Sequence, residues 1–539
     1  MLQGVMQRMA WLHTWLGLCV GWLAYFVFVL GSVAYFDTEI DRWMRPELPL
    51  RTSAAQAIPS TQSIVSAYRY LDGEPLAEGA QVWEIVAPQG HEVAHLSAGW
   101  RQPQSGGRMS RGISSGTRLL DYDGTPLIAP RATGGGYALY RLHVQLHYLP
   151  RLTGFYLTGI CAMAVLLCVF SGIVLHKRLL RDLFLFRPDK RARSWLDAHT
   201  TVGTMAIPYL IFMAYSGLVF LNSSYLPWLV DGNFGDNGRS RYIATVFPRH
   251  AIPAPAGIAA PTLTPETIFT RTQQHWGGSE LAAYTIWNPG DANARIGVER
   301  ARHGVERGNE QLLFDGVSGE LLEAREAPRS TPRRVYDAIL GIHEGNFAPG
   351  WLRALYFAAG LLGSSVIATG SILWVHKRLP RHAAQRPTLG CMLAQRLNVG
   401  VFAGLPIALA AYFWANRLLS ADFETRAAWE MHALFLTWGI CLLFGLFRSP
   451  ARSWRELCVL AAAAYLLLPL LNGLCSERHL GVTLPAGDWG LAGIDLALLL
   501  IGIVFGALAW WLDFRRRRSL PHRADPLFAP AGFGGNRPC

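Results

Sequence analysis

The feature that most constrains this chain is a set of eight apolar segments, each long enough to approach the ~20 helical residues that cross the hydrocarbon core of a bilayer. They lie near residues 11–36, 151–176, 200–222, 351–376, 397–416, 430–447, 456–472 and 490–512. Hydrophobic residues make up 51% of the 539 positions and charged residues only 16%, which excludes an ordinary soluble protein. The first segment is too long for a signal peptide and no small-residue cleavage site follows it, so we expect it to remain as an anchor. The sequence predicts an α-helical polytopic membrane protein.

Positive charges set the expected orientation of the segments. Lysine and arginine gather after the second, fourth, sixth and eighth segments, and the long loops 38–145 and 223–342 alternate with them. Because positively charged loops stay in the cytoplasm, we expect both termini there and both long loops outside. The net charge of +12 then reflects topology. Nucleic-acid binding would need a basic soluble domain, which the sequence does not contain.

The cysteines exclude two kinds of redox or metal site. The eight cysteines show no CxxC spacing of an iron–sulfur or zinc site, and neither long loop contains a pair that could be oxidised.

The first four segments form two tandem units. "HTWLG" at 13–17 opens the first segment and "HTTVG" at 199–203 opens the third, and a glycine follows each histidine by 18 positions, at Gly31 and Gly217. Each unit continues into a long loop with a helical start, at 59–71 and 264–276, and a later Asp-Gly turn between apolar residues, at 118–128 and 311–323. We therefore expect two small α+β domains outside the membrane. The four C-terminal segments, 397–512, lie outside the repeat, and we expect them to be separable.

Six histidines lie at the ends of the first four segments, in two layers. His13, His176, His199 and His376 fall at the cytoplasmic edge, and His147 and His343 at the outer edge. A single histidine at a helix end is explained by capping of carbonyls or by the headgroup region. Recurrence at matched depth favours function instead, because facing imidazoles on a four-helix bundle are what six-coordinate haem iron requires. Glycines within one turn of three of these histidines, Gly17, Gly172 and Gly203, leave room for a flat macrocycle, although close helix packing predicts them as well.

Several stretches resemble a known family. "HKRLLRDLFLFRPDKRARSWLDAH" (176–199), "LHTWLGL" (12–18), "LHVQLHYL" (142–149) and "IHEGNFAPGWLRALYF" (342–357) are similar to the PepSY-associated transmembrane helix family, and most similar within it to the inner-membrane ferric-siderophore reductases of Gram-negative bacteria. The resemblance covers about residues 8–380. It implies two PepSY-like periplasmic domains, two or more b-type haems held by transmembrane histidines, and electrons delivered outward to a ferric siderophore.

The resemblance and the repeat together predict the haem-iron ligands. The motif histidines are His13, His147, His176, His199 and His343; His376 departs from the family pattern, which ends that helix in Lys-Arg, and is the weakest candidate. Equivalent residues of the two units predict His147 with His343 as the outer pair. For the inner layer, His13 with His199 follows the symmetry, while His176 with either follows the motif.

The implied reaction is one-electron reduction of Fe(III), because Fe(II) is held poorly by hard oxygen ligands and leaves the siderophore. A quinol or a cytoplasmic flavin would donate the electrons. Two other classes of function stay open. One is a PepSY module whose outer domains bind or inhibit a periplasmic protease, with no haem. The other is a transporter that uses Asp495, Glu430 and His432 as relay groups, although no pair of discontinuous helices is visible.

The expected organisation has seven parts. They are a first transmembrane helix at 1–37, a periplasmic PepSY-like domain at 38–145, two helices around a basic cytoplasmic loop at 146–222, a second PepSY-like domain at 223–342, a fourth helix at 343–380, a four-helix region at 397–513 and a cytoplasmic tail at 514–539.

Overall fold

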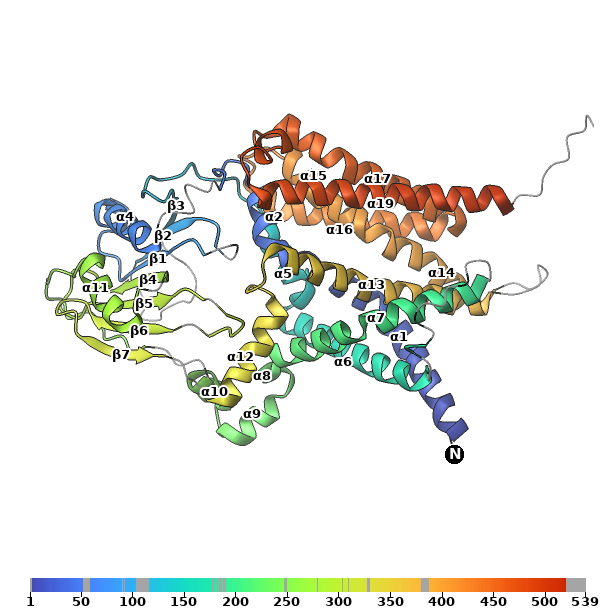
Figure 1. Cartoon of the computed structure of the whole chain (residues 1–539), viewed down its shortest axis with the longest axis horizontal. Helices are drawn as coiled ribbons and strands as arrows, with labels where there is room; N and C mark the ends of the chain where they lie inside the picture. Colours follow the sequence, from blue (N-terminus) through green and yellow to red (C-terminus); the bar gives the residue numbers. More distant parts are fainter. Residues whose placement is uncertain are drawn as a thin grey trace, which may run out of the picture.

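The structure, a computed structural model, describes residues 2–51, 59–89, 91, 93–102, 116–176, 179–181, 183, 187, 191–246, 250–278, 280–302, 304–308, 310–326, 330–379 and 387–519. Most of the basic loop after the second apolar segment, and the predicted tail beyond Ser519, lie outside these residues. Figure 1 shows a helical part with a sheet at one end and the N-terminus at the other. We call these ends the sheet side and the N-terminal side.

The described residues contain eight helical stretches that are long and apolar enough to cross a membrane, which confirms the prediction of a polytopic helical membrane protein. The fifth stretch is interrupted near Pro406, which lacks the backbone N–H that a continuous helix needs. The long helices are α1 (Leu2–Val33), α6 (Arg151–Leu175), α7 (Arg191–Phe220), α13 (Gly350–Arg378), α14 (Leu389–Phe402), α15 (Gly404–Leu418), α16 (Arg426–Phe447), α17 (Pro450–Cys475) and α19 (Trp489–Ser519).

Shorter helices join the long ones at the sheet side. The 3-10 turn η1 (Ala34–Phe36) and α2 (Asp37–Trp43) continue α1, α5 (Gly135–Gln145) precedes α6, and α12 (Thr331–Glu344) precedes α13. Proline caps both of the following long helices, Pro150 at α6 and Pro349 at α13. Its fixed φ suits the start of a helix. The remaining short helices are α8 (Asn222–Tyr225), α9 (Pro227–Phe234), α10 (Gly238–Val246) and α18 (Leu480–Thr483).

The two long loops together form one antiparallel sheet. Its order is β3-β2-β1-β4-β5-β6-β7, so the first loop's β1 pairs with the second loop's β4, in a register that places Ile85 opposite Tyr284. The strands are β1 (Val82–Val86), β2 (Leu96–Arg101), β3 (Gly116–Leu120), β4 (Leu281–Trp287), β5 (Arg295–Arg300), β6 (Gln311–Asp315) and β7 (Leu321–Arg325). The α+β character that the sequence predicted is confirmed, and the pairing of β1 with β4 makes the two loops one body.

One helix from each loop covers this sheet, as Figure 1 shows: α4 (Ser60–Gly73) and α11 (Pro265–Trp276). Both form where the sequence predicts a helical start, and β6 and β7 pair across the predicted turn at 311–323. Ile64 of α4 and Ile268 of α11 are fully buried in a core with Ile85, Tyr284 and Ile286 of the strands. The alternation of buried and partly exposed side chains along β4 and β5 indicates a sheet with one covered face.

The C-terminal helices share a core with the first unit. Leu405, Tyr412 and Leu434 are fully buried against Leu30 of α1 and Leu139 of α5. Polar side chains add to this contact, because Asn398 of α14 accepts hydrogen bonds from Trp22 of α1 (2.9 Å) and Ser371 of α13 (2.8 Å). The C-terminal region therefore stabilises elements of the repeat, and the expectation that it is separable does not follow from the packing.

Candidate functional site

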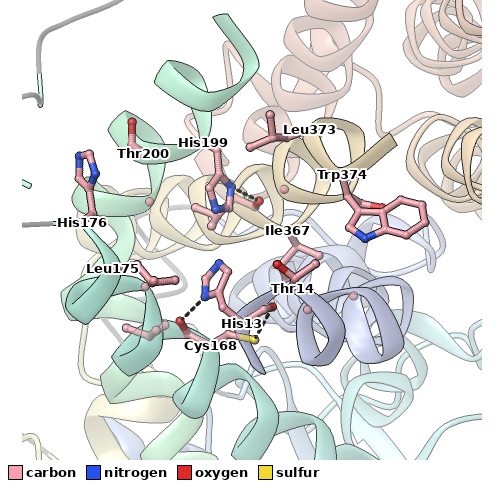
Figure 2. Close-up of a pocket in the computed structure, with 18 of the residues that line it drawn as sticks. His13, Thr14, Cys168, Leu175, His176, His199, Thr200, Ile367, Leu373 and Trp374 are labelled. Carbon is pink, nitrogen blue, oxygen red and sulfur yellow. Dashed lines mark hydrogen bonds between the residues drawn. The ribbon is translucent and has the colours of Figure 1, made fainter. Parts of the chain in front are cut away.

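The first candidate site is a cavity of about 430 Å³ on the N-terminal side, enclosed by α1, α6, α7 and α13. His13 of α1 and His199 of α7 project into it from opposite sides, as Figure 2 shows. Their ring centroids lie 6.2 Å apart and the ring planes meet at 74°. Imidazole nitrogens bind metals at about 2 Å, so two rings on either side of one metal have centroids about 6 Å apart. Of the inner-layer alternatives, the structure brings His13 and His199 together.

The two imidazoles are held in the same way by equivalent residues of the two units. Nδ1 of His13 lies 2.9 Å from the carbonyl oxygen of Cys168 in α6, and Nδ1 of His199 lies 3.0 Å from that of Val366 in α13. A hydroxyl three residues later is also within reach of each Nδ1, Ser171 at 3.2 Å and Thr369 at 3.4 Å. Because a carbonyl oxygen only accepts, Nδ1 carries the proton in both rings and Nε2 keeps its lone pair. A hydrogen bond from the ring nitrogen that does not face the metal fixes the ring orientation of metal-binding histidines in this way.

Glycines give these rings their space. A Cβ atom at Gly172 would lie 3.2 Å from Cε1 of His13, and one at Gly370 would lie 2.9 Å from Cε1 of His199. Both distances are tighter than ordinary contact, so a side chain at either position would displace the imidazole. Gly172 was among the glycines that the sequence selected, and Gly370 is its equivalent in the second unit.

The other two inner-layer histidines lie elsewhere. His176 caps the C-terminal end of α6 and lines the same cavity, but Figure 2 places it at the edge of the view, apart from the facing pair. The ring of His376 stacks on Trp195, with centroids 5.9 Å apart, and His376 is not among the described residues that line the cavity. Lys377 and Arg378, which follow it in α13, do line the cavity.

A second cavity, of about 410 Å³, lies at the sheet side of the same helices. His143 of α5 and His343 of α12 line it, together with the two glycines that follow His13 and His199 by 18 positions. A Cβ atom at Gly31 would meet His143 at 3.7 Å, and one at Gly217 would meet His343 at 3.5 Å. Eighteen helical residues span about 27 Å, so the two cavities are separated by most of a bilayer core.

His143 and His343 resemble the first pair in protonation. Nδ1 of His143 donates to the carbonyl oxygen of Tyr140, at the end of the same helix. Nδ1 of His343 lies 2.6 Å from Oγ of Ser216, whose hydroxyl already donates to the carbonyl of Phe212, so Ser216 accepts from His343. Burial lowers the pKa of His143 to about 4 and, with the neighbouring His143, the pKa of His343 to about 3. Both imidazoles are therefore neutral at physiological pH, as metal ligation requires.

His147, which the sequence paired with His343, does not lie in this cavity. The helix α5 ends at Gln145, and positive φ angles at Leu146 (57°) and Tyr148 (62°) turn the chain away. His147 is exposed, and its ring stacks on Phe435 of α16 with centroids 5.6 Å apart. The pair that the structure brings to one cavity is His143 with His343, so the prediction of His147 with His343 is corrected.

A spacing in the sequence would have indicated His143. His343 precedes the capping Pro349 by six residues, whereas His143 precedes Pro150 by seven and His147 by three. His143 and His343 also both lie in the last turn of their helices. Counting back from the prolines therefore selects His143, but a second histidine four residues later in "LHVQLHYL", His147, made the assignment from sequence ambiguous.

The described residues contain no group of three or more His, Cys, Asp or Glu side chains arranged to hold a metal ion. Each cavity instead offers two neutral imidazoles, apolar walls and glycine-lined space, a donor set that fits a six-coordinate haem iron. The acidic residues considered for a transporter are buried and hydrogen-bonded: Glu430 with Asn416 (2.8 Å) and Asp495 with Trp43 (2.9 Å). Glu430 also accepts from the backbone N–H of Gly134, so both carboxylates join the C-terminal helices to the first unit.

Comparison with known proteins gives two similarities. A family described as the PepSY-associated TM region matches residues 10–377. An uncharacterised protein of Pseudomonas aeruginosa is 25% identical over 371 residues, which cover 66% of this chain and 89% of the relative. The four histidines that face the two cavities lie within the matched region.

Proposed function

Since the chain belongs to the PepSY-associated TM family, we propose that it is a haem-containing membrane reductase that passes electrons across the bilayer to Fe(III) in a siderophore. The observation that carries this proposal is the pair of equivalent imidazole sets, one at each end of the four-helix bundle. A structural role would explain one buried histidine. It does not explain four histidines that are neutral or hydrogen-bonded through Nδ1, with glycines at matched positions around them.

The chain's own residues would hold two b-type haems. His13 with His199, and His143 with His343, would hold the two haem irons through Nε2. The carbonyls of Cys168 and Val366 orient the first pair. When bound, each haem supplies a one-electron redox centre at membrane depth.

The surroundings of the first cavity suit such a group. Its walls are formed mainly by apolar side chains of α1, α6, α7 and α13, which exclude water and so protect a reduced metal. Lys377 and Arg378 lie at its rim, where they would pair with the carboxylates of the macrocycle. We do not include His147 and His376 among the ligands, because their rings stack on Phe435 and Trp195 and neither residue is among the described residues that line the two cavities.

Positive charge on the N-terminal side favours a cytoplasmic position for that side, and a periplasmic position for the sheet, in a bacterial inner membrane. A quinol or a cytoplasmic flavin would donate electrons on the N-terminal side. The ferric siderophore would accept them on the sheet side, because Fe(II) is released more readily by hard oxygen ligands.

An absorption spectrum of the detergent-purified protein, recorded with and without dithionite, tests this function. We expect a Soret and an α band typical of six-coordinate b-type haem, and a pyridine haemochrome assay that returns about two haems per chain. A folded protein that contains no haem would refute the reductase. It would favour the family's other class of function, a sheet that binds a periplasmic protein and is anchored by the helices.

A further inference from the structure

A third cavity, of about 520 Å³, lies between the sheet and the membrane-spanning helices. It is enclosed by α2, the first turn of α4, the loops after β1 and β3, and the start of α19. Figure 1 shows α2 at this junction. The volume is within the range of ligand-binding pockets in proteins, about 300–1,000 Å³.

Three polar groups around this cavity have no hydrogen-bond partner among the described residues. They are Oγ of Ser63, Nε2 of His91 and the hydroxyl of Tyr122, and all three atoms are buried. Ser63 as a whole is 1% exposed. Buried polar groups are nearly always hydrogen-bonded, so three unsatisfied groups around one cavity indicate a polar occupant. Hydroxyl and imidazole groups recognise ligands that are rich in oxygen atoms.

The charges around the cavity balance. Arg42 forms an ion pair with Asp488 (2.5 Å), and Glu39 forms one with Arg353 (2.5 Å). With Arg51 and Glu280, the described residues that line the cavity supply two guanidinium groups and three carboxylates, and Arg353 neutralises Glu39 from outside the lining. Since the surroundings have no net charge, they favour a neutral or weakly charged ligand over a highly charged anion.

The cavity adjoins the site of His143 and His343 through one short segment. Tyr35 and Asp37 line the histidine cavity, and Thr38 and Glu39, the next residues along the chain, line the third cavity. Arg353 connects the two, because it donates both to the carbonyl of Tyr35 (2.9 Å) and to Glu39. The start of α2 would therefore separate a molecule in the third cavity from the cavity that contains His143 and His343.

We propose that this cavity binds the ferric chelate, and that it selects neutral oxygen-donor complexes of the trihydroxamate type over tris-catecholates. Three hydroxamates lose one proton each and cancel the charge of Fe(III), whereas three catecholates leave a trianion. The inference rests on the proposed reductase function for its choice of substrate, but its binding step requires no haem.

The experiment measures binding of redox-inert gallium(III) complexes to the full-length protein in detergent by titration calorimetry. The probes are the gallium complex of a linear trihydroxamate and a gallium tris-catecholate. The variants are Tyr122→Phe and His91→Ala, singly and combined. Tyr284→Phe is the matched control, because its hydroxyl is also buried and unsatisfied but belongs to the sheet core and does not line this cavity.

We expect the trihydroxamate complex to bind the wild type, each single variant to bind it about 3- to 10-fold more weakly, and the double variant about 10- to 100-fold more weakly. Tyr284→Phe should bind like the wild type, the haem spectrum of every variant should be unchanged, and the catecholate should bind at least 10-fold more weakly. No binding by a haem-replete wild type would overturn the inference, show a cavity that holds only water, and leave the reductase proposal standing. Equal losses in Tyr122→Phe and Tyr284→Phe, or tighter binding of the catecholate, would also overturn it. Gallium binding by a protein without haem would keep the site and refute the reductase.

Discussion

The proton on Nδ1 decides which nitrogen of each of the four cavity-lining histidines is available. Cys168, Val366, Tyr140 and Ser216 each offer an oxygen to Nδ1, so all four rings present Nε2 to a cavity. Three carbonyl oxygens and one hydroxyl set which ring nitrogen carries the proton, and none of these groups titrates near neutral pH. Which ring nitrogen faces each cavity is therefore insensitive to small changes of pH near neutrality.

Replacing the sheet-side ligand tests the correction at this scale. His143→Ala should remove one of the two haems, because it takes away an axial imidazole, and should abolish ferric reduction while the N-terminal-side haem keeps its spectrum. His147→Ala is the matched control, four residues away, and should retain both haems. The pyridine haemochrome ratio of the two variants measures the difference. Haem loss in His147→Ala alone would restore the pair predicted from the sequence.

On the N-terminal side, alanine substitutions distinguish the proposed ligands from the other histidines among four candidates. His13→Ala or His199→Ala should lose the haem of that layer, because the two rings face each other. His376→Ala, whose ring stacks on Trp195, should keep it and change stability by about 0.5 kcal/mol or less. His176→Ala should also keep the six-coordinate spectrum. The reduced Soret and α bands decide, and a loss in His176→Ala equal to that in His13→Ala would favour His176 as a ligand.

Within each of the two units, equivalent contacts join the two long helices. The α1 histidine bonds to α6 and the α7 histidine bonds to α13, and a glycine of the partner helix lies against each ring. In a helix interior alanine is favoured over glycine by about 1 kcal/mol, so these glycines are retained at a cost in helix propensity. The contact with the imidazole explains them.

Gly370→Ala tests this packing between elements. A Cβ atom would lie 2.9 Å from Cε1 of His199, so the ring must move and the N-terminal-side haem should be lost or become five-coordinate. Gly439→Ala in α16 is the control, because nothing lies within 4 Å of its Cβ position, and it should be neutral or slightly stabilising. The measurements are the reduced absorption spectrum and the thermal midpoint. An unchanged spectrum in Gly370→Ala would mean that this ring is not held at an iron.

At the scale of the whole molecule, the C-terminal helices support the sheet-side site. The hydroxyl of Tyr412 in α15 donates to the carbonyl of Gly135 at the start of α5 (2.9 Å), and Glu430 of α16 accepts from the backbone N–H of Gly134 (3.1 Å). Leu139 and Leu142 of α5 are buried in the shared core. The helix that carries His143 is therefore held from outside the repeat.

Truncation after residue 390 should consequently affect the two layers differently. We expect loss of the sheet-side haem, because α5 loses its packing and hydrogen bonds, and retention of the N-terminal-side haem, whose ligands come from α1 and α7. The retained layer serves as the internal control for folding and membrane insertion. Two intact haems in the truncated protein would show that the C-terminal helices are separable, as the repeat alone suggested.

The sequence by itself determined the elements. Segment length and hydropathy predicted all eight spans, turn residues predicted the β6–β7 hairpin, and the tandem repeat selected His13, His199 and His343. These features are local or periodic, and one physical rule applies to each: about 20 apolar residues span a bilayer, Asp-Gly turns a strand, and equivalent positions occupy equivalent depths.

Only the tertiary structure decided which residues meet. His143 and His147 are four residues apart, so in an unbroken helix they would share a face; the end of α5 at Gln145 and the positive φ of Leu146 separate them. The pairing of β1 with β4 and the packing of α15 on α5 join residues about 200 or more positions apart. Such contacts depend on the burial of complementary surfaces from distant segments, and no pattern within either segment encodes its partner.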